Sequence, residues 1–145
     1  MISLSAIYPI IELQNTITDF NMKTYTFNIK PVSKPRMVRS DKWKKRTITD
    51  SYWAFKAELK LNANLQGLKT LPSAIQGVLF IVPMPESWSE KKKIEFNDAP
   101  HMQRPDLDNF LKGLQDCLCA EDSHIWKIGN LSKRWGRTGQ LIIEC

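Results

Sequence analysis

Apolar and polar residues alternate near the start of the chain. Within residues 24–30, Tyr25, Phe27 and Ile29 are separated by polar residues. A period of two predicts a strand with one buried face. Residues 74–82 are almost entirely apolar and lie between prolines, so they are predicted to form a central strand.

Two more strands are predicted near the C-terminus. In residues 125–133, Trp126 and Ile128 fall on one face of the first. Residues 138–144 contain three consecutive aliphatic residues and form the second.

A helix is predicted to follow Asp50, because aspartate is a preferred N-cap, and to end at about Leu65. Trp53, Ala57 and Leu61 share one stripe of this helix. A second, short helix is predicted to follow the Ser-Trp-Ser-Glu sequence that precedes the lysines near residue 91, because this sequence has the form of a capping box.

The strongest helical pattern follows Asp106. Pro105 disfavours helix in the residues before it and aspartate is a preferred N-cap, so the helix is predicted to start at about Leu107, with Asp106 just outside. Six apolar residues then recur at the spacing of one helical stripe, which should face the core. They are Leu107, Phe110, Leu111, Leu114, Cys117 and Leu118.

These elements predict an α+β fold, with a mixed sheet of about four strands and two or three helices packed on it. The 145 residues fit one domain with a useful core. Residues 22–145 are expected to form this domain. Residues 1–21 are expected to be an extension or an arm that packs on a partner, and they lack the basic start of a secretion signal. No apolar run is long enough to span a bilayer, so no membrane association is expected.

Positive charge is concentrated in residues 34–46. This segment has seven basic residues and one acid, which gives +6, the net charge of the whole chain. Such a segment, with Trp43 inside it, suits contact with a phosphate backbone and stacking on a base, although a solubilising loop is the alternative. Its basic residues are Lys34, Arg36, Arg39, Lys42, Lys44, Lys45 and Arg46. Lys91, Lys92 and Lys93 form either a second DNA-facing patch or a solvated surface.

Acidic residues gathered in a basic chain indicate a metal site. Asp106 and Asp108 can converge on one ligand only if Asp106 lies before the helix, because residues two apart within a helix point in different directions. Hard oxygen ligands beside a cationic surface suit Mg²⁺, which polarises phosphate groups and activates water. The alternative is a solvated row in which Asp108, Lys112 and Asp116 form ion pairs at i,i+4 spacing.

Other catalytic schemes have little support. The three cysteines, Cys117, Cys119 and Cys145, form no paired framework and indicate a reduced, cytosolic chain. Cys117 and Cys119 lack a second pair of ligands at zinc spacing. His101 and His124 have no evident catalytic partner, and a structural or surface role is expected for each.

Four short sequences together resemble the RusA family of Holliday junction resolvases. They are Lys-Pro-Arg at 34–36, Pro-Glu-Ser-Trp-Ser-x-Lys-Lys at 85–92, Arg-Pro-Asp-Leu-Asp-Asn-x-x-Lys at 104–112 and Glu-Asp-Ser at 121–123. The resemblance runs from about Met22 to the C-terminus. One departure is Glu121, where the family often has a second aspartate.

The resemblance implies a small, homodimeric endonuclease that depends on Mg²⁺, or on Mn²⁺ in its place. It implies that Asp106, Asp108 and Asp122 bind the metal, that Lys112 is the essential lysine, and that Lys34 and Arg36 contact DNA. The expected location is the cytoplasm of a bacterial host, and a phage or prophage origin is typical of the family.

The position of Asp122 leads to a further hypothesis. A helix from Leu107 to Leu118 rises about 16 Å, while the four residues from Leu118 to Asp122 reach at most about 13–14 Å. Either the helix ends early, or Asp122 completes the metal site of a second subunit. A two-fold dimer with two composite sites would suit paired, symmetric nicks across a four-way junction.

The favoured function is therefore Mg²⁺-dependent resolution of Holliday junctions in recombination and repair. One alternative is a nuclease with a broader range of branched DNA, including flaps and forks. The other is a nucleic-acid-binding module without catalysis, in which the acids are helix caps and ion-pair partners.

Overall fold

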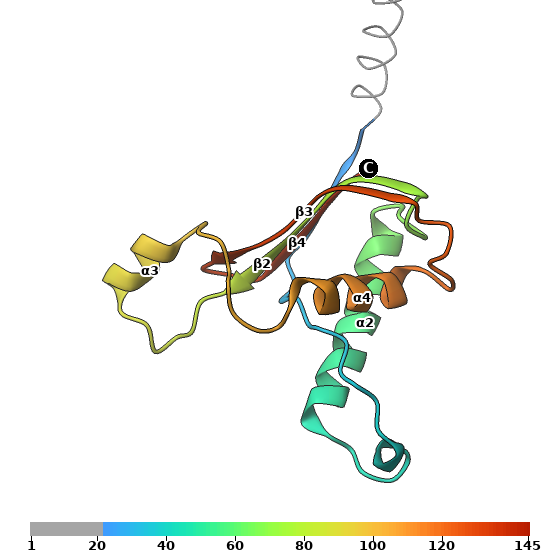
Figure 1. Ribbon diagram of the computed structural model, residues 1–145, viewed down its shortest axis with the longest axis horizontal. Coiled ribbons are helices and arrows are strands. Elements are labelled where there is room, and N and C mark those ends of the chain that lie inside the picture. The colour runs from blue at the N-terminus through green and yellow to red at the C-terminus, as the bar shows by residue number, and fades with distance from the viewer. Residues whose placement is uncertain (1–21) are drawn as a thin grey trace, which may run out of the picture.

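A computed structural model describes residues 22–145, so the predicted extension at 1–21 lies outside the described residues (Figure 1). Within that range one mixed sheet has the strand order β1-β4-β2-β3. β2 and β3 are parallel, and the two other neighbouring pairs are antiparallel. The strands are β1 (Thr24–Phe27), β2 (Ala74–Pro83), β3 (Lys127–Gly136) and β4 (Gln140–Glu144).

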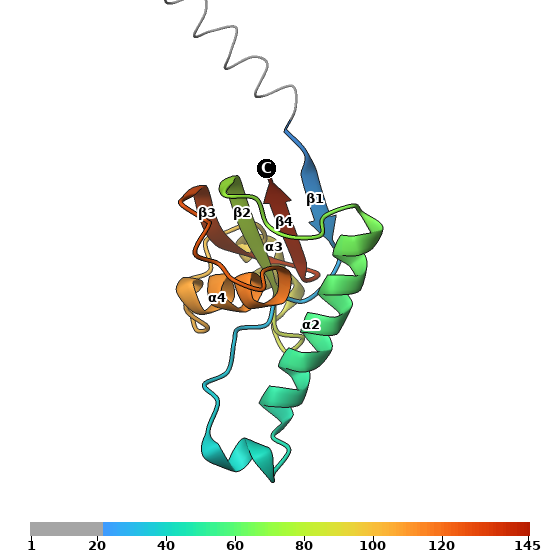
Figure 2. The same ribbon diagram turned by 90° about the vertical axis from the view of Figure 1, so that its right-hand side faces the viewer.

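Two long helices cover one face of this sheet (Figure 2). The third α-helix lies apart, beyond one end of the strands (Figure 1). The helices are α2 (Thr47–Leu65), α3 (Glu90–Phe96) and α4 (Leu107–Leu118), and a short 3₁₀ helix, η1 (Arg39–Lys42), precedes α2. The predicted α+β fold with a mixed sheet of about four strands is confirmed.

The core lies between the sheet and the two long helices. β2 is a central strand, as predicted, and its alternate residues Val78 and Phe80 are buried. Phe27 and Ile29 are also buried, as the period of two predicts. The strand itself ends at Phe27, which pairs with Leu141 of β4.

The prediction for α2 was wrong about where the helix starts. The helix begins earlier, at Thr47, so Asp50 lies in its first turn rather than at its cap. The stripe of Trp53, Ala57 and Leu61 faces solvent, with Trp53 and Leu61 51% and 61% exposed. Apolar residues occur on two stripes of this helix, and periodicity alone does not decide which is buried. The buried stripe is Tyr52, Phe55, Leu59 and Ala63.

Two other boundaries differ from the predictions. The N-cap of α3 is Ser89, because a turn occupies the residues around Ser87. The Oγ of Ser89 accepts a hydrogen bond from the Lys92 amide at 3.2 Å. β3 begins after Trp126, where its pairing with β2 starts. Trp126 is therefore 74% exposed and does not share a strand face with Ile128.

A small aromatic cluster joins α3 to the end of β3. The Trp135 ring lies 4.9 Å from the Trp88 ring and 4.2 Å from the His101 ring, measured between centroids. His101 is only 3% exposed, and its Nδ1 has no hydrogen-bond partner within residues 22–145. Burial, and then the charge of Lys133, lower the pKa of His101 below its ordinary value of 6.5. His101 thus has the structural role expected of it.

This burial predicts a pH-dependent stability. A histidine whose pKa is lowered on folding takes up a proton more readily in the unfolded chain, so stability is complete above pH 6.5 and is lost as the pH falls through that value. Replacing His101 with leucine should therefore reduce the fall in melting temperature between pH 7.5 and pH 5.5, measured by circular dichroism. Equal falls in both proteins would contradict this account.

Candidate active site

The N-terminus of α4 presents two carboxylates. Asp106 is the N-cap in an extended conformation, just outside the helix as predicted, and its side chain makes no capping hydrogen bond. Asp108 lies in the first turn, and both residues are exposed. The positive end of the helix dipole favours negative charge at this position. Both carboxylates are therefore exposed at the N-terminus of α4, and the Asp106 carboxylate does not cap the helix.

The predicted row of ion pairs along α4 does not form. Asp116 pairs instead with Lys34, which lies on another segment. Within residues 22–145, neither Asp108 nor Lys112 belongs to an ion pair. Residues four apart share one side of a helix, so the Asp108 carboxylate and the Lys112 ammonium lie on the same side of α4. The ion pairs expected for this row are therefore absent within residues 22–145, while Asp108 and Lys112 are both exposed to solvent.

A lysine from β3 fixes the segment that leads into Asp106. The Lys133 ammonium donates hydrogen bonds to the carbonyl oxygens of Gln103 and Pro105 at 2.5 and 2.7 Å. The amide of His101 in turn donates to the Lys133 carbonyl at 3.1 Å. These contacts tie the segment to the edge of the sheet. Sequence reasoning missed Lys133 because its partners are backbone carbonyls, which carry no residue signature.

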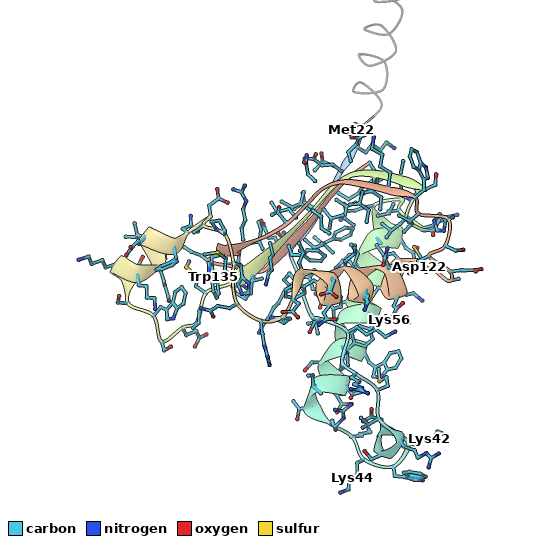
Figure 3. The ribbon with its side chains drawn as sticks, in the orientation of Figure 1. Met22, Lys42, Lys44, Lys56, Asp122 and Trp135 are labelled. Carbon is cyan, nitrogen blue, oxygen red and sulfur yellow. The ribbon has the colours of Figure 1, made fainter. Side chains whose placement is uncertain are left out.

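Asp122 lies beyond the opposite end of α4 (Figure 3). The helix does not end early, so its rise of about 16 Å separates Asp122 from the acids at the N-terminus. The Asp122 loop is tied to the segment before β2, because Nε2 of His124 lies 2.8 Å from the carbonyl oxygen of Leu71. No group of three or more His, Cys, Asp or Glu residues within 22–145 could hold a metal. A single chain therefore does not bring Asp106, Asp108 and Asp122 together.

The cationic segment starts against α4 and ends in a compact tip below α2, where Lys42 and Lys44 lie (Figure 3). The amide of Lys34 donates to the carbonyl of Asn109 at 3.4 Å. The segment can approach because α4 has glycine at 113, where a Cβ would lie 3.0 Å from the carbonyl oxygen of Val32. Lys34 is thus placed beside the helix that carries the acids, whereas Lys42 and Lys44 lie in the tip, away from that helix.

Not all of the predicted DNA contacts are free. Arg46 donates from Nε and Nη2 to the Asp41 carboxylate at 2.6 and 2.8 Å, and from Nη2 to the Arg36 carbonyl at 2.9 Å. This hydrogen bonding from Arg46 holds the pKa of Asp41 below its usual range. Arg46 is therefore a structural residue of the tip. On α3, the Lys92 ammonium lies 4.1 Å from the centre of the Trp88 ring, a cation–π contact.

Comparison with known protein families identifies the family of this chain. The model of the family described as endodeoxyribonuclease RusA matches residues 27–144. The chain belongs to the RusA family. It is an endodeoxyribonuclease of the Holliday junction resolvase class, acting on branched DNA by hydrolysis of phosphodiester bonds. The alternative of a binding module without catalysis is thereby set aside, whereas a broader range of branched substrates stays a prediction.

Other comparisons add little. No curated protein matches the chain. Among the described helices, none combines the length and apolar character that crossing a membrane requires.

The donors at the start of α4 suit a hard divalent cation. Mg²⁺ is usually held by one or two carboxylates, with water and substrate phosphate oxygens in its remaining positions. Asp106 and Asp108 offer carboxylate oxygens that no ion pair or cap within residues 22–145 occupies.

The Lys133 contacts predict a positioning role. Replacing Lys133 with methionine should weaken Mn²⁺ binding about tenfold, because residues that orient metal ligands typically contribute at least that much to metal affinity. Isothermal titration calorimetry of the protein with Mn²⁺ alone measures this. Lys127→Met is a matched control, because Lys127 lies on the same strand and is exposed. Equal Mn²⁺ affinity in the Lys133 variant and the wild type would contradict the role.

Proposed function

We propose that this RusA-family chain resolves Holliday junctions by paired, symmetric, Mg²⁺-dependent nicks in DNA recombination and repair. One observation supports this most. Asp106, Asp108 and Lys112 are exposed at the start of α4 without ion-pair partners within the described residues, beside a cationic segment. A phosphate backbone attracted by the lysines and arginines would meet these carboxylates.

Each residue has a separate task in this proposal. Asp106 and Asp108 hold the cation, and the hydrogen bonds from Lys133 keep the segment before Asp106 in place. When bound, Mg²⁺ would supply charge neutralisation at the scissile phosphate and activation of water. Lys112, one turn beyond Asp108, places its ammonium where negative charge develops in the transition state.

The metal ligands can be tested with a labelled four-way junction. Cleavage should occur with Mg²⁺ and should be absent with EDTA or Ca²⁺. Asp108→Asn should lower the cleavage rate by a factor on the order of 10² to 10³, because one preorganised charge is lost, while binding of the junction is retained.

Glu58→Gln is the matched control, since it removes the same charge from an exposed residue of α2 that belongs to no ion pair within residues 22–145. This variant should cut at close to the wild-type rate. If Asp108→Asn cut as fast as Glu58→Gln, the assignment of Asp108 as a ligand would be wrong.

We also infer that the chain acts as a homodimer with composite sites. α4 reaches Leu118, so Asp122 lies at the far end of the helix from Asp106 and Asp108. In a two-fold dimer, the Asp122 end of one subunit can lie beside the Asp106 end of its partner, and symmetry then creates two equal sites. Two such sites would cut the two opposed strands of a four-way junction.

Subunit mixing tests the sharing. When Asp108→Asn protein and Asp122→Asn protein exchange subunits, each heterodimer has one intact site, so nicking should return to about a quarter of the wild-type level. Nicking is measured on a junction labelled on one strand at a time.

A mixture of Asp106→Asn and Asp108→Asn proteins is the control. Both changes damage the same end of α4, so no heterodimer regains an intact site and no activity should return. Failure of the first mixture to recover, with subunit exchange verified by mass spectrometry, would rule out sharing.

A further inference from the structure

A second cationic surface adjoins the start of the cationic segment, at Lys34. It is a groove of about 740 Å³ between α2, the start of the cationic segment and the end of α4. Tyr52 and Cys117 form part of its floor, and both are buried. Burial raises the pKa of Cys117 to about 11, so this thiol stays neutral and adds no negative charge to the groove.

The rim of the groove carries four lysines against one carboxylate. Lys56 and Lys60 lie four residues apart on one side of α2, and Lys69 follows the turn after that helix. The other two charged residues of the lining, Lys34 and Asp116, pair with each other. Three lysines are therefore left in excess, and no ion pair within residues 22–145 involves them.

The lining of the groove includes residues from two parts of the proposed site. Lys34 and Met37 belong to the start of the cationic segment. Cys119 and Ala120 lie immediately before the loop that carries Asp122. A chain of phosphates in the groove would run from the cationic segment toward that loop.

We propose that this groove binds the sugar-phosphate backbone of one DNA arm, with Lys56, Lys60 and Lys69 as its phosphate contacts. A polyanion fits because three lysines without ion-pair partners within residues 22–145 line a groove that is open to solvent. Trp53 adds an exposed ring at the rim, with the Lys56 ammonium 5.3 Å from its centre. The proposal rests on the proposed function and adds the path by which DNA reaches the acids.

Salt-dependent binding tests the groove without requiring cleavage. Binding of a fluorescein-labelled four-way junction is measured in EDTA between 50 and 200 mM salt. Removing two phosphate contacts with Lys60→Gln/Lys69→Gln should make the slope of log K against log salt shallower by about 1.8. The affinity lost over this salt range should then be about tenfold smaller than in the wild type.

The double variant Lys23→Gln/Lys127→Gln is the matched control. It removes the same charge from exposed lysines near the ends of β1 and β3, outside the groove, and should keep the wild-type slope. Equal slopes in the groove variant and the wild type would overturn the proposal. So would a change in the oligomeric state of the groove variant at an unchanged slope, since the groove would then be a surface between subunits. Absence of cleavage by the wild type would count against the proposed function and not against the groove.

Discussion

Burial of one stripe of α4 against β2 is the constraint on which the site depends. The rings of Phe80 and Phe110 stack with centroids 5.3 Å apart, and Leu114 and Cys117 are completely buried. Each large apolar side chain buried in this way contributes about 1.5–3 kcal/mol. Rotating the helix by one residue would forfeit much of that burial, so its orientation is fixed. That orientation also directs Asp108 to solvent and sets where each end of the helix lies.

Polar contacts position the two segments that flank α4. The segment before α4 and the loop after it both lie outside the apolar cluster, and each is tied down through a backbone carbonyl. The Lys133 ammonium donates hydrogen bonds to the carbonyls of Gln103 and Pro105. The ring of His124 lies within hydrogen-bond distance of the carbonyl oxygen of Leu71. Burying apolar residues therefore positions the helix, while hydrogen bonds position the acids that flank it. A small domain with one core has few other ways to fix a loop.

The sequence predicted the parts of this structure whose signals are local. The α4 boundaries followed from Pro105, from aspartate as a preferred N-cap residue and from one apolar stripe. They were right because no second stripe competes there, although the Asp106 side chain makes no capping hydrogen bond. The buried stripe of α2 did not follow from the sequence, because Trp53 and Tyr52 lie on different stripes with similar periodicity. The groove could not be predicted, because its lysines are separated along the chain and only folding brings α2 beside the end of α4. The separation of Asp122 from the other acids was predictable, since it depends only on helix length.

The compact tip of the cationic segment affects the cost of the proposed contact with DNA. A tail with this composition would lose conformational freedom when it binds, and that loss would weaken the complex. Here the guanidinium of Arg46 bridges Asp41 and the backbone at Arg36, so part of the segment is ordered before any partner arrives. Arg46, one of the seven basic residues of the segment, therefore stabilises the conformation of the segment. Apart from Lys34, which pairs with Asp116, the other basic residues belong to a segment that is already ordered in part, so the proposed contact with DNA depends less on folding upon binding.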